Sequence, residues 1–275
     1  MTEELVRYEP RPAAVLITLN RPDKRNALSR AQIQALKDAF ERAMRDAAAR
    51  CVILTGAGPA FCAGMDLAEL AETVTPHPTP SPPGGEGGVR GPAETAIWDD
   101  ARRLMGLYEL IYSLPKPTIA AVNGAAVAGG AGLVTVCDLA LAAPSAVFGY
   151  PEVRRGLVAA MVMPHLLRHV GERCARHLLL TGELIDAAEA CRLGLINRVV
   201  PSEQLLEKAM EWARSLADGG PNALAMTKSL LQRFSRQALS VEETARASAA
   251  PRLSEECQQG LRAFFAKQPN PWNPG

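Results

Sequence analysis

The chain has 275 residues, of which 48% are hydrophobic and 21% charged, and its formal net charge is +1. This composition is typical of a globular protein with a core of ordinary size, and the balanced charge excludes a general attraction to nucleic acid or anionic membranes. The N-terminal residues lack a signal-peptide pattern, and no apolar run approaches the length of a membrane helix, so we expect a cytoplasmic protein without a membrane partner.

The first part of the chain alternates strand and helix patterns. Residues 14–19 read as a strand, and Ser29 with Gln32 three residues later forms a capping box at the start of a helix. A β-branched strand follows at residues 51–55. Strand, helix and strand in this order predict a right-handed crossover that joins two parallel strands.

A strand, a glycine-rich bend and a helix follow one another at residues 118–138. The bend carries only small residues, and the N–H groups at the start of such a helix favour developing negative charge. The strand at residues 51–56 also runs toward a tight turn, Ala63-Gly64-Met65-Asp66. Two turns of this kind can form an oxyanion hole with two donors, which suits a thioester carbonyl that becomes an enolate.

Proline and glycine dominate residues 73–92, so we expect an exposed or disordered loop there. A helix is predicted at 96–113, and short strands at 139–142 and 147–148. Further helices are predicted at residues 156–170, 173–180, 186–193, 202–217, 223–233, 240–249 and 254–266.

Glu152 follows Phe148-Gly149-Tyr150-Pro151 and is flanked by apolar and small residues. Burial would raise the pKa of its carboxyl, which would suit an acid or base near neutral pH. The alternative is an exposed loop glutamate paired with Arg154 or Arg155. The residues themselves leave both interpretations open.

Six segments in this order resemble the crotonase family, the enoyl-CoA hydratases and isomerases. They are ITLNRPDKRNALS at 17–29, AFCAGMDL at 60–67, IAAVNGAAVAGGAG at 119–132, FGYPEVRRGL at 148–157, LTGELIDAAEACRLGLINRVV at 180–200 and LRAFFAK at 261–267. The resemblance implies an α/β fold: a crotonase-like spiral of repeated ββα units over residues 1–200 and a helical C-terminal trimerisation region over 201–275. It also implies an acyl-CoA substrate, no metal or redox cofactor, and a homotrimer or homohexamer.

The resemblance assigns roles to individual residues. The oxyanion donors would be the N–H groups of Met65 and Gly129, and Glu152 matches the second catalytic glutamate of the family. The substrate- and CoA-binding positions would be Lys24, Arg25, Ala27, Leu28, Ala63, Asp66, Gly132, Phe264 and Lys267. Asp66 is expected to order its loop or to cap the following helix, and the segment at 73–92 lies where the family carries a variable flap, although an inert insertion is the alternative.

The chain departs from the hydratases at Gly132, where they carry their first catalytic glutamate. Moving a double bond needs one base, whereas adding water uses two carboxylates, so the sequence favours an isomerase. The volume left at Gly132 could hold a bulkier acyl chain, or an acid from elsewhere could replace the missing group. Candidates for that acid are Glu69, Glu72, Glu94 and Asp99.

Two other functions remain open from the sequence. One is a hydratase that works with one glutamate or a substitute acid. The other is an inactive homologue that binds CoA or RNA. The near-neutral charge weighs against RNA, and the retention of Glu152 weighs against loss of activity.

Overall fold

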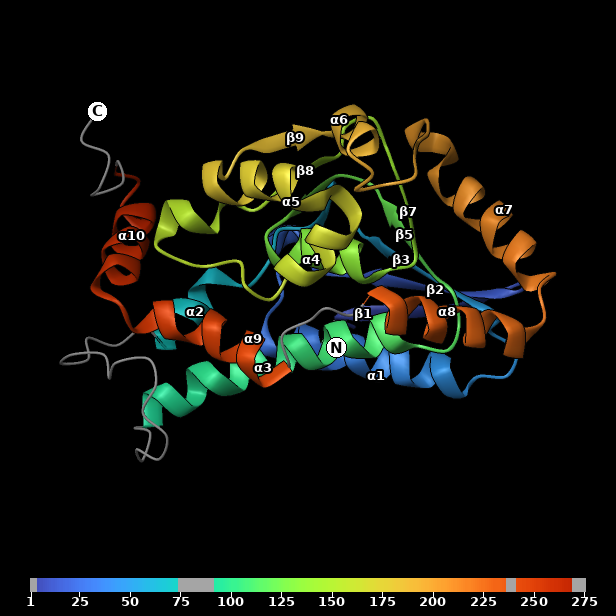
Figure 1. The fold of residues 1–275 in the computed structure, drawn as a ribbon, viewed down its shortest axis with the longest axis horizontal. Helices are drawn as coiled ribbons and strands as arrows, with labels where there is room; N and C mark the ends of the chain where they lie inside the picture. Colours follow the sequence, from blue (N-terminus) through green and yellow to red (C-terminus); the bar gives the residue numbers. More distant parts are fainter. Residues whose placement is uncertain (1–3, 74–91, 236–240, 269–275) are drawn as a thin grey trace.

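The computed structural model describes residues 4–73, 92–235 and 241–268 (Figure 1). In that part of the chain two sheets are formed, with strand orders β1-β2-β3-β5-β7-β10 and β4-β6-β8-β9. The strands of the larger sheet are β1 (Val6–Arg11), β2 (Ala14–Leu19), β3 (Cys51–Gly56), β5 (Thr118–Val122), β7 (Leu139–Ala142) and β10 (Arg198–Val199). The strands of the smaller sheet are β4 (Ala60–Cys62), β6 (Ala125–Val127), β8 (Val147–Gly149) and β9 (Leu184–Asp186).

The predicted parallel pairing of β2 with β3 is confirmed. Helix α1 (Arg30–Arg45) joins β2 to β3, which pair in parallel with Ala14 opposite Cys51. The hydroxyl of Ser29 accepts the Gln32 N–H at 3.1 Å, so the predicted N-cap forms. The Gln32 side chain, by contrast, is buried without a hydrogen-bond partner, so the reciprocal half of the capping box is missing.

The larger sheet is covered on both faces, because residues that alternate along a strand point to opposite sides. Helix α7 (Leu205–Ala217) covers one face, where its Ala209 and Ala213 pack with Ile53 and Ile119. The other face belongs to the main core. The helices that contribute to that core include α1, α3 (Pro92–Ser113), α4 (Gly129–Val136) and α5 (Met163–Thr181). Figure 1 shows α4 at the centre of the molecule, and every one of its residues is buried.

Of the strands in the smaller sheet, the sequence predicted only β8. Its strands are three residues long, too short to show an alternation that distinguishes a strand from a turn. β4, β6 and β8 pair in parallel, and β9 closes the edge antiparallel to β8. The three parallel strands therefore end at one edge, close to the start of α4.

The predicted helix at 156–170 begins later than expected. Residues 157–162 are not helical, because the short helix η2 (Pro151–Arg155) ends at Gly156, whose φ of 69° turns the chain away. Helix α5 contains the rest of this predicted helix together with the one predicted at 173–180, and it has a kink at Gly171 between them. The predicted helix at 186–193 is α6 (Ala187–Arg192), capped by Asp186.

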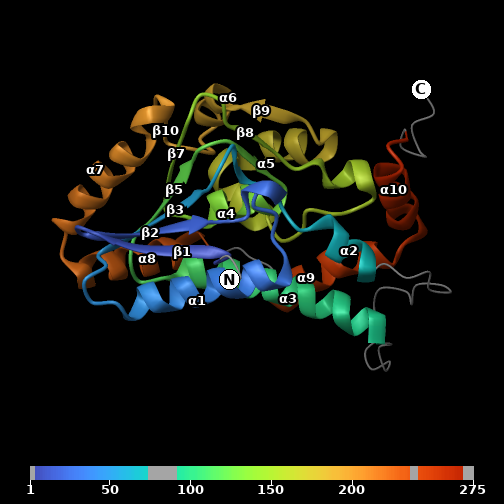
Figure 2. The same ribbon diagram turned by 180° about the vertical axis from the view of Figure 1, so that it is seen from behind.

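The C-terminal helices pack back onto the body of the chain. They are α8 (Pro221–Ser235), α9 (Val241–Ala249), the short η4 (Ala250–Leu253) and α10 (Glu255–Phe265). Helix α9 lies against α3, and α10 lies against η2 and beside α2 (Leu67–Thr73), as Figures 1 and 2 show. Leu70 of α2 packs with Cys257 and Leu261 of α10. The division of the chain at residue 200 stays a prediction.

The proline- and glycine-rich segment is bounded by α2, which ends at Thr73, and α3, which begins at Pro92. The residues between them, 74–91, lie outside the described part of the chain, so the predicted loop is untested. In the described ranges no helix combines the length and the apolar character that crossing a bilayer requires.

Candidate active site

Three predicted catalytic positions follow the ends of three neighbouring parallel strands. Met65 comes shortly after β4, Gly129 after β6 and Glu152 after β8. Because the carboxyl ends of parallel strands meet at one edge of a sheet, the fold brings these residues together from widely separated parts of the sequence. The smaller sheet is thus the scaffold of the candidate site.

The two glycine-rich turns touch each other. Gly64 has a φ of +91°, and a Cβ placed on it would lie 3.2 Å from the Gly129 nitrogen. Gly129 opens α4, so its N–H has no partner within the helix. Met65 forms a parallel bridge with Leu28, and the Ala128 N–H donates to Gly149 at 2.8 Å. The two turns are therefore fixed side by side, as two converging N–H donors require.

Ala128, the residue before α4, has a φ of 53° and a ψ of −124°. This conformation is unfavourable for a residue with a Cβ, so the turn stores backbone strain. The hydrogen bond from Ala128 to β8 helps to hold it. Strain at this point is consistent with a turn shaped for ligand contact.

Glu152 lies in η2, and its Oε2 is buried without a hydrogen-bond partner among the described residues. Burial raises the pKa of its carboxyl from 4.5 to about 7, against a hydrogen bond to its own backbone and the charge of Arg155, which lower it. A carboxyl of this kind exchanges protons readily near neutral pH. The acid–base interpretation of Glu152 therefore has a physical basis in the fold.

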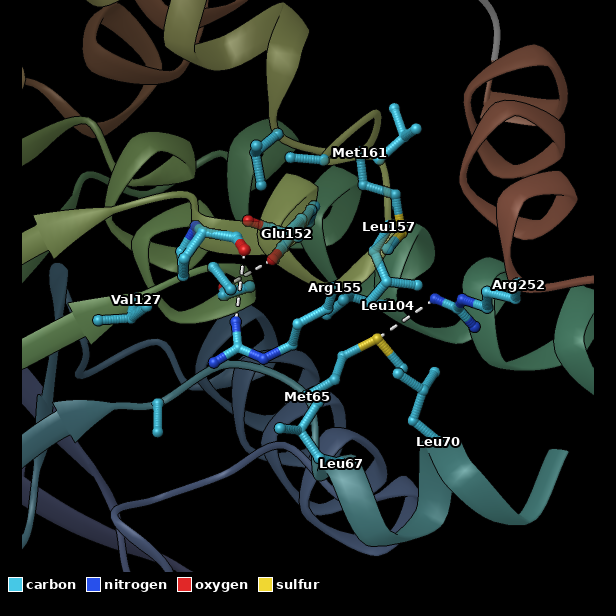
Figure 3. A pocket seen from close by; sticks show the side chains of 18 residues that line it. Met65, Leu67, Leu70, Leu104, Val127, Glu152, Arg155, Leu157, Met161 and Arg252 are labelled. Atoms are coloured by element: carbon cyan, nitrogen blue, oxygen red, sulfur yellow. Dashed lines mark hydrogen bonds between the residues drawn. The ribbon is translucent and has the colours of Figure 1, made fainter. Parts of the chain in front are cut away.

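These groups border a cavity that contains about 770 Å³ of empty space, including its open mouth (Figure 3). Most of its wall is apolar. The apolar side chains that line it include Met65, Leu67, Leu70, Leu104, Leu157 and Met161. Among the described residues that line it, Glu152 is the only carboxylate. The cavity suits an apolar chain that places a reacting group next to the two turns and Glu152.

The enoyl-CoA hydratase/isomerase family matches this sequence over residues 11–82 and 92–274. The chain belongs to this family. A curated relative from Thermus thermophilus, named a putative enoyl-CoA hydratase, is 42% identical over 96% of this chain and 99% of its own length.

Two solved structures of this family extend the comparison. An enoyl-CoA hydratase/isomerase from Xanthobacter autotrophicus superposes with a TM-score of 0.83 at 30% identity and covers 100% of both chains. A monofunctional enoyl-CoA isomerase from M. smegmatis superposes with a TM-score of 0.68 at 31% identity, over 89% of this chain and 99% of its own. The similarity confirms the family resemblance and the predicted crotonase-like α/β fold.

The volume at Gly132 is not empty. A Cβ placed on Gly132 would lie 2.7 Å from Val162 and even closer to the hydroxyl of Tyr108, which fills the space beside it. Gly132 is buried and does not line the cavity, whereas Tyr108 does. The expectation that the missing side chain leaves room for an acyl chain is therefore wrong at this position, because the aromatic ring of Tyr108 from α3 occupies it.

Tyr108 is also hydrogen-bonded to the turn at Gly129. Its hydroxyl donates to the carbonyl oxygen of Gly129 at 2.6 Å. Burial, together with Cys62 and Glu152, raises the pKa of the Tyr108 phenol well above its usual value, so it stays protonated. The resemblance expects a glutamate at position 132, where this chain has a glycine. The neutral hydroxyl of Tyr108 fills the space beside that glycine and anchors the first residue of α4.

None of the four candidate substitute acids lines the cavity. Glu69 accepts the Arg30 N–H at 2.7 Å, and Glu72 lies 3.8 Å from the Arg30 guanidinium with most of its side chain exposed. Glu94 and Asp99 lie on α3, away from the cavity-lining residues of that helix. Among the described residues of this segment, none brings a second carboxylate to the cavity beside Glu152.

The predicted CoA-binding segment runs beside the Met65 turn. Leu28 donates to Gly64 at 2.7 Å, and Ala63 donates to Arg25 at 3.0 Å. Lys24 and Arg25 are exposed, and Ala27 is half-buried. Exposed cations beside the Met65 turn suit a phosphate group outside the cavity.

Asp66 lies in the same turn. Its carboxylate pairs with Arg21 at 3.1 Å and accepts the Ala68 N–H at 3.1 Å. These contacts place it where the sequence expects it, ordering the loop at the start of α2.

Phe264 and Lys267 stand at the end of α10 and are exposed. The Arg155 guanidinium lies 4.5 Å from the centre of the Phe264 ring. The contact links α10 to the element that carries Glu152, within one chain. Lys267 adopts a φ of 53° just beyond the helix and has no described contact with the site.

Sequence reasoning missed two polar residues that line the cavity, Tyr108 and Arg252, and named a third, Arg155, only as a possible partner of Glu152. Tyr108 follows the apolar face of a predicted helix and reads as a core residue. Arg252 lies between two predicted C-terminal helices and reads as a surface charge. Only the packing of α3 and of η4 against the site reveals them.

Proposed function

We propose that this protein moves a carbon–carbon double bond in an acyl-CoA thioester, through an enolate held by the N–H groups of Met65 and Gly129. The observation that carries the proposal is the single carboxylate, Glu152, among the described residues that line the cavity. One base is sufficient for migration. No metal or redox cofactor takes part in the proposed reaction.

The proposed mechanism has two proton transfers. The Glu152 carboxylate removes a proton from the α-carbon of a 3-enoyl-CoA, and the electron pair shifts to the thioester oxygen to form a dienolate. The two backbone donors stabilise that oxyanion; loss of one such donor typically costs roughly 3–4 kcal/mol. Protonated Glu152 then returns the proton to the γ-carbon, which leaves a 2-enoyl-CoA. A carboxyl with a pKa of about 7 can serve both steps.

Hydration of a 2-enoyl-CoA is the second candidate. It is favoured by the name of the Thermus relative, a putative enoyl-CoA hydratase. In this case Glu152 would activate the water and the site would have to supply the second proton from a group other than a carboxylate. The phenol of Tyr108 is buried next to the site, but its hydrogen is used in the bond to Gly129.

A panel of straight 2-enoyl- and 3-enoyl-CoA thioesters tests the two candidates. Double-bond migration is followed by the absorbance of the conjugated product, and hydration by the mass gain of one water. We expect migration to be the faster reaction. Hydration of crotonyl-CoA on the order of 10²–10³ s⁻¹ without comparable migration would overturn the proposal in favour of the second candidate.

A further inference from the structure

Arg252 of η4 borders the same cavity as Glu152, although it comes from a distant part of the sequence. Its residue surface is only 3% exposed. Figure 3 shows its guanidinium directed into the cavity, toward the Met65 side chain. A cation in the wall of an otherwise apolar cavity requires an explanation.

Arg252 has no acidic partner among the described residues. Within the described part of the chain, its Nη1 is buried and has no hydrogen-bond partner, and its Nη2 reaches only the Met65 sulfur at 3.4 Å. A thioether is a weak acceptor. The acid whose charge raises the pKa of Arg252, Asp100, is bound by Arg30 at 2.8 Å and by Arg103 at 3.2 Å. The negative charge of Asp100 is thus already shared by two other arginines.

An unpaired buried guanidinium is costly to the fold. Arginine stays protonated in proteins, so it cannot escape the cost by losing its charge. Burial lowers the pKa of Arg252, as desolvation of a cation requires. An anion that entered the cavity would remove this cost and could form two parallel N–H···O bonds with the guanidinium fork.

The position of Arg252 defines where on a substrate that anion would be. The N–H of Met65 is a proposed oxyanion donor, and the sulfur at the far end of the same side chain touches Arg252. In Figure 3, Met65, Leu104 and Leu157 lie between Glu152 and Arg252. A short apolar chain could lie along these side chains with its thioester at one end and its anionic group at the other.

We infer that the acyl group of the substrate carries a second carboxylate at its far end and that Arg252 binds it. The substrate class is then the mono-CoA thioesters of short dicarboxylic acids. The inference rests on the proposed function for the acyl-CoA substrate, but it concerns recognition and holds for either reaction.

Arg155 is a poorer candidate for this role. Its guanidinium lies over the Phe264 ring and donates to the Pro151 carbonyl at 3.4 Å. It is also only three residues from Glu152, so it lies at the reacting end of the cavity. Arg252 is the cavity cation that faces the far end.

Binding of unreactive ligands tests the inference without any catalytic step. Calorimetry would compare hexanedioyl-CoA with hexanoyl-CoA, which differ only in the terminal carboxylate. We expect the dicarboxylic ligand to bind roughly 10- to 100-fold more tightly, the range of a buried hydrogen-bonded charge pair. Arg252→Met should abolish this preference, and Arg252→Lys should retain part of it. Arg246→Met, at an exposed side chain of α9, should leave it unchanged. Equal affinities in the unsubstituted protein would overturn the inference, even if Arg252→Met fails to fold.

Turnover separates this inference from the proposed function. The pairs compared are hex-3-enedioyl-CoA with hex-3-enoyl-CoA, and hex-2-enedioyl-CoA with hex-2-enoyl-CoA. Conversion of the neutral thioesters with no preference for the carboxylated ones would overturn the inference and leave the proposed function standing. Preferential binding of hexanedioyl-CoA with no turnover of any thioester would support the inference and overturn the proposed function.

Discussion

At the scale of single residues, the chemistry of the candidate site depends on the environment of Glu152. The carboxyl has apolar neighbours in the cavity wall, and its charged form is disfavoured there. The cost of burying it is what makes it a useful base near neutral pH.

Replacement of Glu152 by glutamine should lower kcat by at least ~10²-fold, because the amide cannot accept and return a proton. The affinity for CoA thioesters should change little, since the side chain keeps its size. In the unsubstituted protein, kcat/KM for migration should rise with pH through an apparent pKa near 7, where Glu152 becomes the carboxylate. Turnover at the unsubstituted rate in Glu152→Gln would contradict the mechanism.

At the scale of elements, α3 and α4 pack so closely that a side chain at position 132 meets Tyr108. A glycine on α4 and a tyrosine on α3 therefore belong together, and a change at one position demands a change at the other. The family resemblance identified Gly132 as a departure, but it did not identify Tyr108, the other member of this pair.

Gly132→Glu should not restore hydration by itself. It should instead destabilise the fold by roughly 1–3 kcal/mol or more, because its Cβ would overlap Tyr108 and Val162. Tyr108→Ala/Gly132→Glu should be less destabilised than the sum of the two single changes, and hydration relative to migration should rise only in this double variant. Urea unfolding measures the first effect. A stable single variant that hydrates crotonyl-CoA would show that the tyrosine is not the obstacle.

The start of α4 offers a test of the oxyanion donor. Gly129→Pro removes one N–H at a first helical position, where proline is normally tolerated, and should lower the rate by roughly 10²–10³-fold. Gly129→Ala is the matched control, since it keeps the N–H and its Cβ would come no closer than 3.3 Å to Tyr108. Circular dichroism establishes that both variants are folded. Equal rates in two folded variants would place the oxyanion donor elsewhere.

At the scale of the whole molecule, the raised pKa of Glu152 affects stability. The folded state binds the Glu152 proton more tightly than the unfolded chain does, so the carboxyl's contribution is favourable below pH 4.5 and is lost as the pH rises toward 7. The glutamine of Glu152→Gln does not titrate, so the variant does not lose stability in this way as the pH rises. Between about pH 4.5 and pH 8 the variant should therefore gain on the order of 3 kcal/mol relative to the unsubstituted protein. Urea unfolding at both pH values checks this, and a constant difference would contradict the buried carboxyl.

Assembly is a prediction of the family resemblance, which implies a homotrimer or homohexamer. Large apolar side chains are exposed on the single chain, among them Met226 and Leu231 of α8, at 65% and 64%. Their burial between copies would stabilise an oligomer. Light scattering should give three or six times the mass of one chain, and the mass of a single chain would contradict the prediction.

The sequence by itself indicated the larger framework and the candidate catalytic positions. Residues 14–19 and 51–55, with the capped helix between them, indicated a parallel pair because burial on both faces leaves long apolar runs and caps leave a local signal. The two glycine-rich turns came from local patterns, and the resemblance to the family assigned the roles of Met65, Gly129 and Glu152 within matching motifs. Each of these features depends on a few consecutive residues, so it can be recognised without knowing the fold.

Only the tertiary structure decided which residues face one another. The strands β4 and β6 are too short to be recognised from a pattern, yet together with β8 they bring Met65, Gly129 and Glu152 to one edge. Likewise, nothing near position 132 in the sequence indicates that Tyr108 fills the space beside it. The buried cation Arg252 reads as a surface charge until η4 packs against the cavity. Contacts between distant segments depend on how the elements pack, so they cannot be predicted from a local stretch of sequence.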